Sequence, residues 1–134
     1  MVRPQTYSVM YAVSVSGDFV AQHVLTVPEA GPEGEWHSHR YGVRLEVRGE
    51  LLDEHGYLVD VDDLTAALDS VVDRYRDETL NDFPEFEGNN PSLERFARII
   101  CDRALAELDD PIVDAAAVEL REDDVARATY EREI

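Results

Sequence analysis

Two histidines that lie one residue apart, His37 and His39, stand in the stretch EGEWHSHRYGVRLEV at residues 33–47. The sequence after them alternates apolar and charged residues, which predicts a strand. Residues at i and i+2 of a strand point to one face, so we expect the two imidazoles side by side. Three histidines with an open fourth position are a common catalytic zinc site, and His23 and His55 are the other histidines of the chain. The spacing alone is a weak metal signal.

Two glutamates, Glu33 and Glu35, lie directly before this pair. A carboxylate can act as a general base when it lies within hydrogen-bond reach of the proton that it removes. Both glutamates also belong to residues 26–35, which carry two prolines and two glycines and are typical of a loop. A solvated acidic loop is therefore the alternative interpretation.

The composition predicts one domain over residues 1–134 that acts in the cytoplasm. The single cysteine, Cys101, leaves no disulfide within the chain, which is typical of a reducing compartment. No window approaches the roughly 20 apolar residues of a membrane span, and the first residues contain no apolar signal core. We therefore expect neither membrane insertion nor secretion.

The charge of the chain excludes some partners. There are 30 acidic and 12 basic residues, for a net charge of −18, and every basic residue is an arginine. Such a surface repels nucleic acid and anionic membranes, so we expect neither as a partner. Self-repulsion destabilises a compact acidic chain and salt screens it, which predicts a halophilic protein. An ordinary acidic protein is the alternative.

The elements that position the histidines are predicted from periodicity. Residues 7–15 alternate as a strand, Gly17-Asp18 is expected to end it, and the apolar run FVAQHVL follows. A second strand is expected over 41–51, and a hairpin tip around His55-Gly56.

The period then changes to that of helices. Apolar residues from Leu64 to Tyr75 predict one helix, capped by Asp62 or Asp63, and a second helix opens at Pro91-Ser92 and extends to Leu108. Two further strands are expected within 112–122 and 126–133. The order β-β-α-α-β-β predicts an α+β fold in which two helices cover one face of an antiparallel sheet.

Several short motifs, in order and spread over nearly the whole chain, resemble those of the 6-pyruvoyl tetrahydropterin synthase / 6-carboxytetrahydropterin synthase family. They are FVAQH (19–23), HSHRY (37–41), HGYLVDVDDL (55–64), LND (80–82) and NPSLE (90–94), and then Glu122 with Tyr130 eight residues later. The resemblance implies the tunnelling fold, in which strands of several subunits close a barrel. It also implies a homo-oligomer, a trimer or hexamer, with sites at the subunit interfaces.

The resemblance also implies a site for a dihydropterin. The zinc (Zn²⁺) ligands would be His23, His37 and His39, while His55 is expected to be solvated. Glu122 matches the carboxylate that binds the pterin N–H edge, where a bidentate pair can form. Ser92 matches a residue that binds the pterin ring, and helix capping is an equal and compatible interpretation.

Two departures from the family pattern bear on activity. The catalytic cysteine is missing before the histidine pair, and Cys101 falls in a helical apolar stripe that predicts a core position. Some family members use a glutamate instead and cut the side chain to leave 6-hydroxymethyl-dihydropterin. Glu35 is the favoured candidate for that base, ahead of Glu33. The family's Asp-His relay is replaced by Arg76-Asp77, which makes Asp77 a further catalytic candidate.

The sequence thus predicts a zinc-dependent lyase acting on 7,8-dihydroneopterin, its phosphate or its triphosphate. One alternative is the 6-carboxytetrahydropterin synthase reaction in queuosine or archaeosine precursor synthesis. Another is a non-catalytic paralogue that binds zinc and a pterin.

Overall fold

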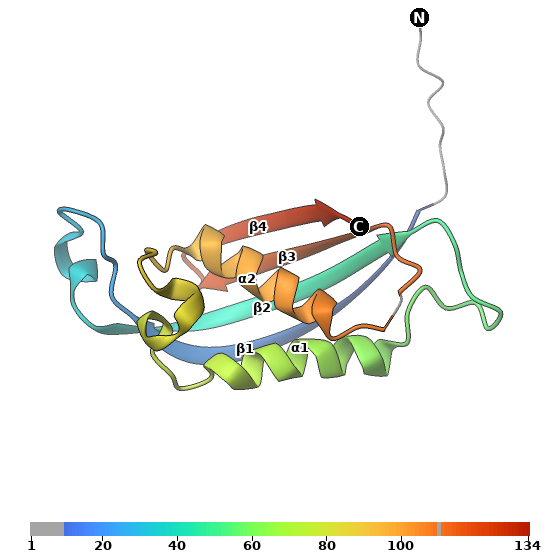
Figure 1. The fold of residues 1–134 in the computed structure, drawn as a ribbon, viewed down its shortest axis with the longest axis horizontal. Helices are drawn as coiled ribbons and strands as arrows, with labels where there is room; N and C mark the ends of the chain where they lie inside the picture. Colours follow the sequence, from blue (N-terminus) through green and yellow to red (C-terminus); the bar gives the residue numbers. More distant parts are fainter. Residues whose placement is uncertain (1–9, 110) are drawn as a thin grey trace, which may run out of the picture.

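The computed structural model describes residues 10–109 and 111–134, which form one four-stranded antiparallel sheet and two helices. The strands are adjacent in the order β1-β2-β3-β4, and both helices lie on one face of the sheet (Figure 1). This confirms the predicted α+β fold and its element order. The bounds are β1 Tyr11–His23, β2 His37–Gly49, α1 Val61–Tyr75, α2 Leu93–Ala106, β3 Ala115–Glu122 and β4 Ala126–Glu133.

The predicted break at Gly17-Asp18 is wrong, because β1 runs without interruption to His23. Gly17 pairs with Val43 and Asp18 with Gly42, so the ladder to β2 continues across the dipeptide. Gly17 also faces the core, where a Cβ would make only ordinary contacts at 3.9 Å. Cross-strand pairing and packing therefore override the local turn signal. Residues 7–9 of the expected first strand lie outside the described part of the chain.

The second strand begins earlier than predicted, at His37 rather than at residue 41, so both histidines of the pair belong to β2 itself. The turn at His55-Gly56 is present, but it leads into α1 and not into a strand, which corrects the predicted hairpin. Asp53 organises this turn, since its carboxylate accepts hydrogen bonds from the amides of His55 and Tyr57 at 2.8 and 2.9 Å.

Each helix begins at a side-chain cap. Asp60, and not Asp62 or Asp63, caps α1 by accepting a 2.8 Å bond from the amide of Asp62. The capping residue must have a non-helical backbone, and Asp60 is extended while the two later aspartates already lie in the first turn. Ser92 caps α2 through the amide of Arg95 at 3.2 Å, which confirms the predicted capping role.

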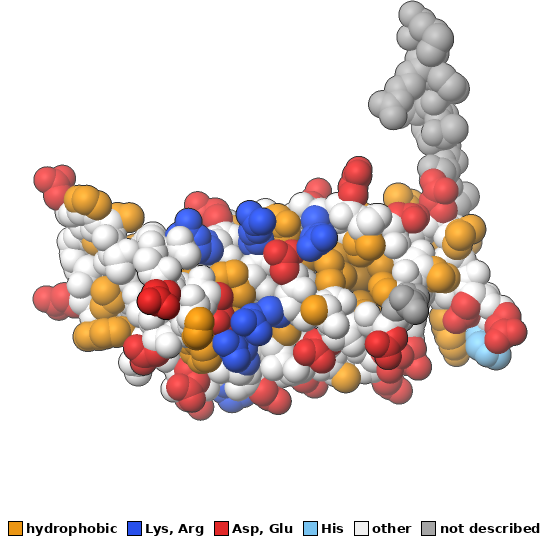
Figure 2. Space-filling view, viewed as in Figure 1, with side chains coloured by type: hydrophobic (Ala, Val, Ile, Leu, Met, Phe, Trp, Pro, Cys, Tyr) orange, Lys and Arg blue, Asp and Glu red, His pale blue; other side chains and the backbone are white. Residues whose placement is uncertain are grey.

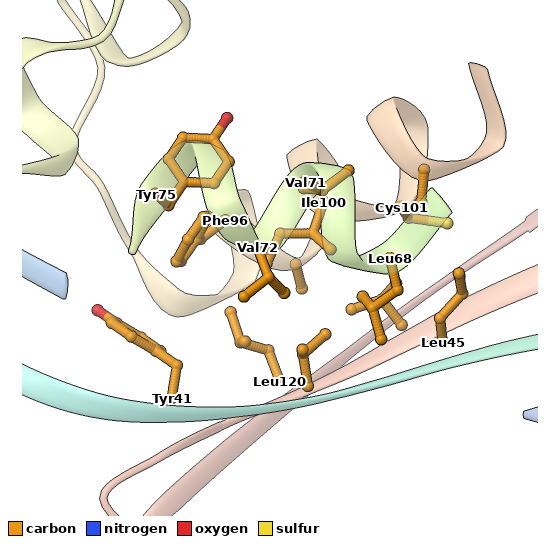
Figure 3. Packing of buried hydrophobic residues seen from close by; sticks show 14 of the residues in the cluster. Tyr41, Leu45, Leu68, Val71, Val72, Tyr75, Phe96, Ile100, Cys101 and Leu120 are labelled. Atoms are coloured by element: carbon orange, nitrogen blue, oxygen red, sulfur yellow. The ribbon is translucent and has the colours of Figure 1, made fainter. Parts of the chain in front are cut away.

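Both helices contribute to one apolar core with the inner face of the sheet. Phe96 of α2 lies at its centre and contacts Tyr41 and Tyr75 edge to face, with ring centroids 5.2 and 5.1 Å away (Figure 3). Cys101 is fully buried in the same cluster, as predicted, and its burial raises the pKa of the thiol to about 11. This layer of aromatic rings forms the floor beneath the end of the sheet that carries the histidines.

Glu85, in the loop between the helices, joins both of them. Its carboxylate accepts bonds from Arg74 at 2.9 and 3.0 Å, approaches Arg103 at 3.2 Å and receives the hydroxyl of Tyr75. Burial alone would raise the pKa of Glu85, but these donors lower it to about 2. The short helices Leu80–Asp82 and Pro84–Phe86 are thereby held against the core.

Acidic side chains are spread over the helix-covered face, with a group of arginines near its middle (Figure 2). None of the helices within residues 10–109 and 111–134 has the length and apolar composition needed to cross a membrane.

Candidate functional site

Strand register brings the three predicted ligand histidines together. His23 at the end of β1 pairs directly with His37 at the start of β2, and His39 pairs with Ala21. All three side chains lie on the face that the helices cover, because they share the parity of the buried residues Phe19 and Tyr41. Their ring centroids are 4.5 to 4.9 Å apart. His55 is exposed and lies apart from them, as predicted.

The three Nε2 atoms point to a common centre. Each is buried and has no hydrogen-bond partner among the residues that the structure describes, and the ligand atoms of the three histidines lie within 4.8 Å of one another. Buried polar nitrogens without a partner are costly, and three in one place are unusual unless they bind something that supplies the missing interaction. The donor set therefore fits a metal ion held by three imidazoles with further positions open.

Burial and repulsion from the two neighbouring imidazoles keep His23 uncharged. His23 is 2% exposed, and desolvation together with its neighbours His37 and His39 lowers its pKa to about 4. A neutral imidazole retains the lone pair that metal binding requires. The environment thus favours the ligand form of His23 at neutral pH.

The Nδ1 atoms of the three rings have three different neighbours. His37 Nδ1 lies 2.7 Å from the backbone carbonyl of Glu35, and His23 Nδ1 lies 3.3 Å from the Tyr41 hydroxyl. His39 Nδ1 contacts the carboxylate of Asp123. Sequence reasoning missed both Tyr41 and Asp123 as partners. Tyr41 could have been suspected from its strand parity with the histidines, whereas no sequence pattern indicated Asp123.

A pocket of about 230 Å³ opens beside the cluster. His23 and Ser92 line it together with three carboxylates, those of Glu33, Glu94 and Glu122. No arginine is among the lining residues in the described part of the chain. The pocket is therefore strongly anionic, and it suits a ligand that donates hydrogen bonds.

Glu122 ends β3 opposite Tyr41 and continues the buried parity of Val118 and Leu120. Its Oε1 atom lies 3.5 Å from His39 Nε2, and its side chain is 18% exposed. Burial and the nearby Glu33 raise its pKa, while His39 acts in the opposite direction. Within the described part of the chain no arginine pairs with Glu122, and a half-buried carboxylate of this kind is well placed to accept two parallel N–H donors.

The two upstream glutamates differ in how they meet the cluster. The carboxylate of Glu33 belongs to a group with His39 and Glu122 in which the ligand atoms lie within 4.8 Å of one another. Glu35 contributes its backbone carbonyl to His37, and its side chain is exposed. Glu33 is also exposed; it lies in the short helix Gly31–Gly34, and its carbonyl accepts the amide of Leu25 at 2.9 Å.

Two asparagines of the LND and NPSLE motifs hold the chain that follows His23. Asn81 bonds both the amide and the carbonyl of Val24 at 2.9 Å, and Asn90 accepts the amide of Thr26 at 2.8 Å. Sequence reasoning used these motifs for recognition and did not foresee this role.

Asp77 lies in the loop after α1, and its amide donates to the carbonyl of Val20 at 2.7 Å. Its side chain is exposed and is not among the pocket-lining residues. Arg76 contacts Asp73 and the backbone of Asp18 at 3.5 Å and is likewise absent from the pocket lining.

Comparison with known proteins agrees with this geometry. The family model of 6-pyruvoyl tetrahydropterin synthase matches residues 12–133. The fold is similar to 6-pyruvoyl tetrahydropterin synthase of Caenorhabditis elegans, with 19% identity, a TM-score of 0.77, and coverage of 92% of this chain and 96% of that one.

Two further structures have a similar fold. A Plasmodium vivax 6-pyruvoyltetrahydropterin synthase, in which a glutamate described as the catalytic residue is replaced by alanine, is 19% identical with a TM-score of 0.79, covering 94% of this chain and 99% of that one. A dihydroneopterin aldolase from Burkholderia thailendensis, bound to guanine, is more distant, with 13% identity, a TM-score of 0.52, and coverage of 93% and 90%.

Proposed function

The chain belongs to the 6-pyruvoyl tetrahydropterin synthase family, and on this basis we propose that it is a zinc-dependent lyase acting on the side chain of 7,8-dihydroneopterin. The observation that carries the proposal is the clustering of three imidazole nitrogens, unpartnered among the described residues, beside a pocket that His23, Glu33 and Glu122 line. The proposed product is 6-hydroxymethyl-dihydropterin.

In this proposal His23, His37 and His39 hold the zinc through Nε2. Bound zinc would act as a Lewis acid toward the vicinal hydroxyls of the side chain. The burial of His23 favours the neutral ligand form, as described above. Tyr41 lies edge to face with His23 and His39, with ring centroids 6.5 and 6.0 Å away, and Phe19 and Phe96 pack against Tyr41 in turn.

Glu122 would anchor the pterin. A pterin presents two parallel N–H donors at the edge of its ring, and one carboxylate can accept both. Ser92 lines the same pocket, and its hydroxyl retains a donor hydrogen for the ring while its oxygen caps α2.

Glu33 is the better candidate for the base on the basis of its carboxylate's proximity to His39 and Glu122. In a side-chain cleavage it would take the proton of the second side-chain hydroxyl. The bond between the first and second side-chain carbons then breaks, and the second carbon becomes an aldehyde. The electron pair of the broken bond stays on the first carbon and is delocalised into the dihydropterin ring. A proton returned to the first carbon completes the product. The catalytic glutamate of the Plasmodium vivax relative supports a carboxylate in this role.

The charge of the pocket favours a substrate without a triphosphate. Three carboxylates and no arginine line it in the described part of the chain, so each of these carboxylates would repel a triphosphate and no lining cation would offset the repulsion. Free dihydroneopterin carries only hydroxyls on its side chain and avoids this cost.

The loss of the family's Asp-His pair favours one rival function, a non-catalytic paralogue that binds zinc and a pterin. Asp77, the residue left at that place, is exposed and lies outside the pocket lining. The 6-carboxytetrahydropterin synthase reaction has no comparable observation in its favour.

We also propose that the protein is a cytoplasmic homo-oligomer, a trimer or hexamer. The sheet leaves β1 and β4 as outer strands, and pairing such edges between subunits removes a site of aggregation. Light scattering coupled to size-exclusion chromatography would test this, and a monomer at micromolar concentration would contradict it.

The deciding experiment incubates zinc-loaded protein with dihydroneopterin and, separately, with its triphosphate, and identifies the products by mass. The proposal expects 6-hydroxymethyl-dihydropterin and a two-carbon aldehyde from the free substrate. A 6-pyruvoyl product from the triphosphate would instead assign the ordinary family reaction. Pterin binding without any product would favour the paralogue.

The base is tested by a matched pair, Glu33→Gln and Glu35→Gln. The amide keeps the size of the side chain and removes its basicity, so the Glu33 variant should turn over about 10²–10⁴-fold more slowly with zinc and pterin binding intact. Glu35→Gln should behave as the unmodified protein. The reverse result would return the base to Glu35, and full turnover in both variants would make Asp77 the next candidate.

A further inference from the structure

Asp123 occupies the tight turn that joins β3 to β4. The amide of Val125 donates to the carbonyl of Glu122 at 3.0 Å, and Asp123 and Asp124 both have positive φ values, of 53° and 62°. Two successive residues of this kind make a turn that suits Asp, Asn and Gly. The turn therefore accounts for an aspartate at this position, but not for where its carboxylate points.

The carboxylate of Asp123 reaches back across the sheet to β2. One oxygen accepts the amide of Arg40 at 2.8 Å and the other contacts His39 Nδ1. The backbone amide of Asp123 also donates to the carbonyl of Arg40 at 2.8 Å. Asp123 is thus joined to Arg40 by two bonds, one from its backbone amide and one to its carboxylate, and the second holds the side chain beside the imidazole.

This contact decides which nitrogen of His39 is free. A carboxylate accepts a hydrogen and does not donate one, so the ring hydrogen stands on Nδ1 and the lone pair on Nε2. Nε2 is the atom that faces His23 and His37 without a partner. Of the three rings, only His39 has a charged group at Nδ1 within the described residues, since His37 meets a carbonyl and His23 a hydroxyl.

We propose that Asp123 is a positioning residue of the metal centre, whose carboxylate holds His39 in the tautomer and orientation that present Nε2 to the ion and makes that nitrogen a stronger donor. The proposal rests on the metal function proposed above. Partners of this kind typically change metal affinity 10- to 100-fold when they are removed. Asp123 is not among the residues that line the pocket, and the hydrogen bonds of its carboxylate within the described residues go to His39 and Arg40, so we expect its effect to pass through His39.

Two substitutions remove the carboxylate and keep the turn, because both Asn and Gly adopt positive φ readily. In Asp123→Asn the single amide oxygen can accept from Arg40 or from His39, but not from both. Asp123→Gly removes the acceptor altogether. Asp124→Asn is the matched control, since it makes the same charge change in the same turn, where Asp124 faces Arg121 at 3.3 Å instead of a histidine.

The measurements are the dissociation constant for Zn²⁺, by competition with a chromophoric chelator, the visible spectrum of the Co²⁺-loaded protein, and the melting temperature of the metal-free protein. Both Asp123 variants should bind Zn²⁺ 10- to 100-fold more weakly and shift the Co²⁺ bands, with unchanged metal-free melting. Asp124→Asn should stay within threefold of the unmodified chain.

Three results would overturn the inference. They are Zn²⁺ affinity within threefold in both Asp123 variants, an equal loss in Asp124→Asn, and a loss of affinity that merely follows a lower metal-free melting temperature. An unmodified chain that binds no Zn²⁺ would overturn the metal proposal together with this one, so the two failures are distinguishable.

Discussion

Replacing Glu122 by glutamine tests the pterin anchor with the smallest possible change. The carboxylate ends β3 half-buried, beside His39 and Glu33, and it has no arginine or lysine partner among the described residues. The amide keeps the shape of the side chain but offers one acceptor oxygen. Its NH₂ group would face the second N–H donor of the ring.

The size of the effect follows from that geometry. One charge-assisted hydrogen bond is lost, and such bonds contribute about 1.5–3 kcal/mol. The dissociation constant for a pterin should therefore rise about 10- to 150-fold. The zinc content should not change, because the three histidine nitrogens that form the metal cluster remain in place.

Oxidised neopterin is a suitable probe, because it is fluorescent and presents the same N–H edge without the dihydro ring that the reaction needs. Glu119→Gln is the matched control, since Glu119 lies on the same strand and on the opposite face, 3.7 Å from Arg127. Equal neopterin affinity in Glu122→Gln and the unmodified protein would refute the anchor. An equal loss in Glu119→Gln would show a general effect of charge.

Three further predictions concern the histidine cluster, Glu85 in the loop between the helices, and the acidic composition of the chain. His37→Ala should reduce zinc from about one ion per chain to none by elemental analysis, because two histidines leave too few ligands, and full occupancy in a variant lacking His23, His37 and His39 would contradict the centre. Glu85 has its pKa lowered from 4.5 to about 2, so it stabilises the fold above pH 4.5 and this contribution, about 2–3 kcal/mol, is lost as the pH falls toward 2. Urea unfolding of the unmodified chain and of Glu85→Gln should show that the gap between their free energies of unfolding is larger at pH 7 than at pH 3 by about that amount, because the other acidic residues titrate alike in both chains. Melting temperature should rise steeply from low to molar KCl because repulsion among 30 acidic residues is screened, whereas a flat profile would indicate an ordinary acidic protein.

Most of the fold could be predicted because its pattern is strongly periodic. The six apolar residues expected from Leu64 to Tyr75 are all buried in α1, and the strand expected at 126–133 coincides with β4. Gly17-Asp18 does not form the predicted turn, because the local turn propensity of this dipeptide is outweighed by the pairing of thirteen positions between β1 and β2. The prediction of the capping residue of α1 failed because three nearby aspartates offer the same side chain. Only the backbone conformation distinguishes Asp60 from the other two.

The site was predictable to the extent that strand parity determines it. Parity places His37 and His39 on one face, and the motif before them supplies His23, so the metal cluster needed no tertiary information beyond register. Asp123 was not predictable in the same way. Its contact with His39 joins residues 84 positions apart and depends on a left-handed turn that sequence alone does not specify.

The two candidate bases show the same limit on a smaller scale. Parity favoured Glu35, which stands two residues before His37, but parity applies only inside a strand, and β2 begins at His37 itself. Upstream of that point the chain turns through Gly31, at φ 66°, and a short helix that brings the carboxylate of Glu33 toward His39. Glu35 instead uses its carbonyl to hold the His37 ring. Loop geometry therefore gives the two glutamates different contacts, the carboxylate of Glu33 with His39 and Glu122 and the carbonyl of Glu35 with His37, and Glu33→Gln and Glu35→Gln would test whether the first of these serves the proposed reaction.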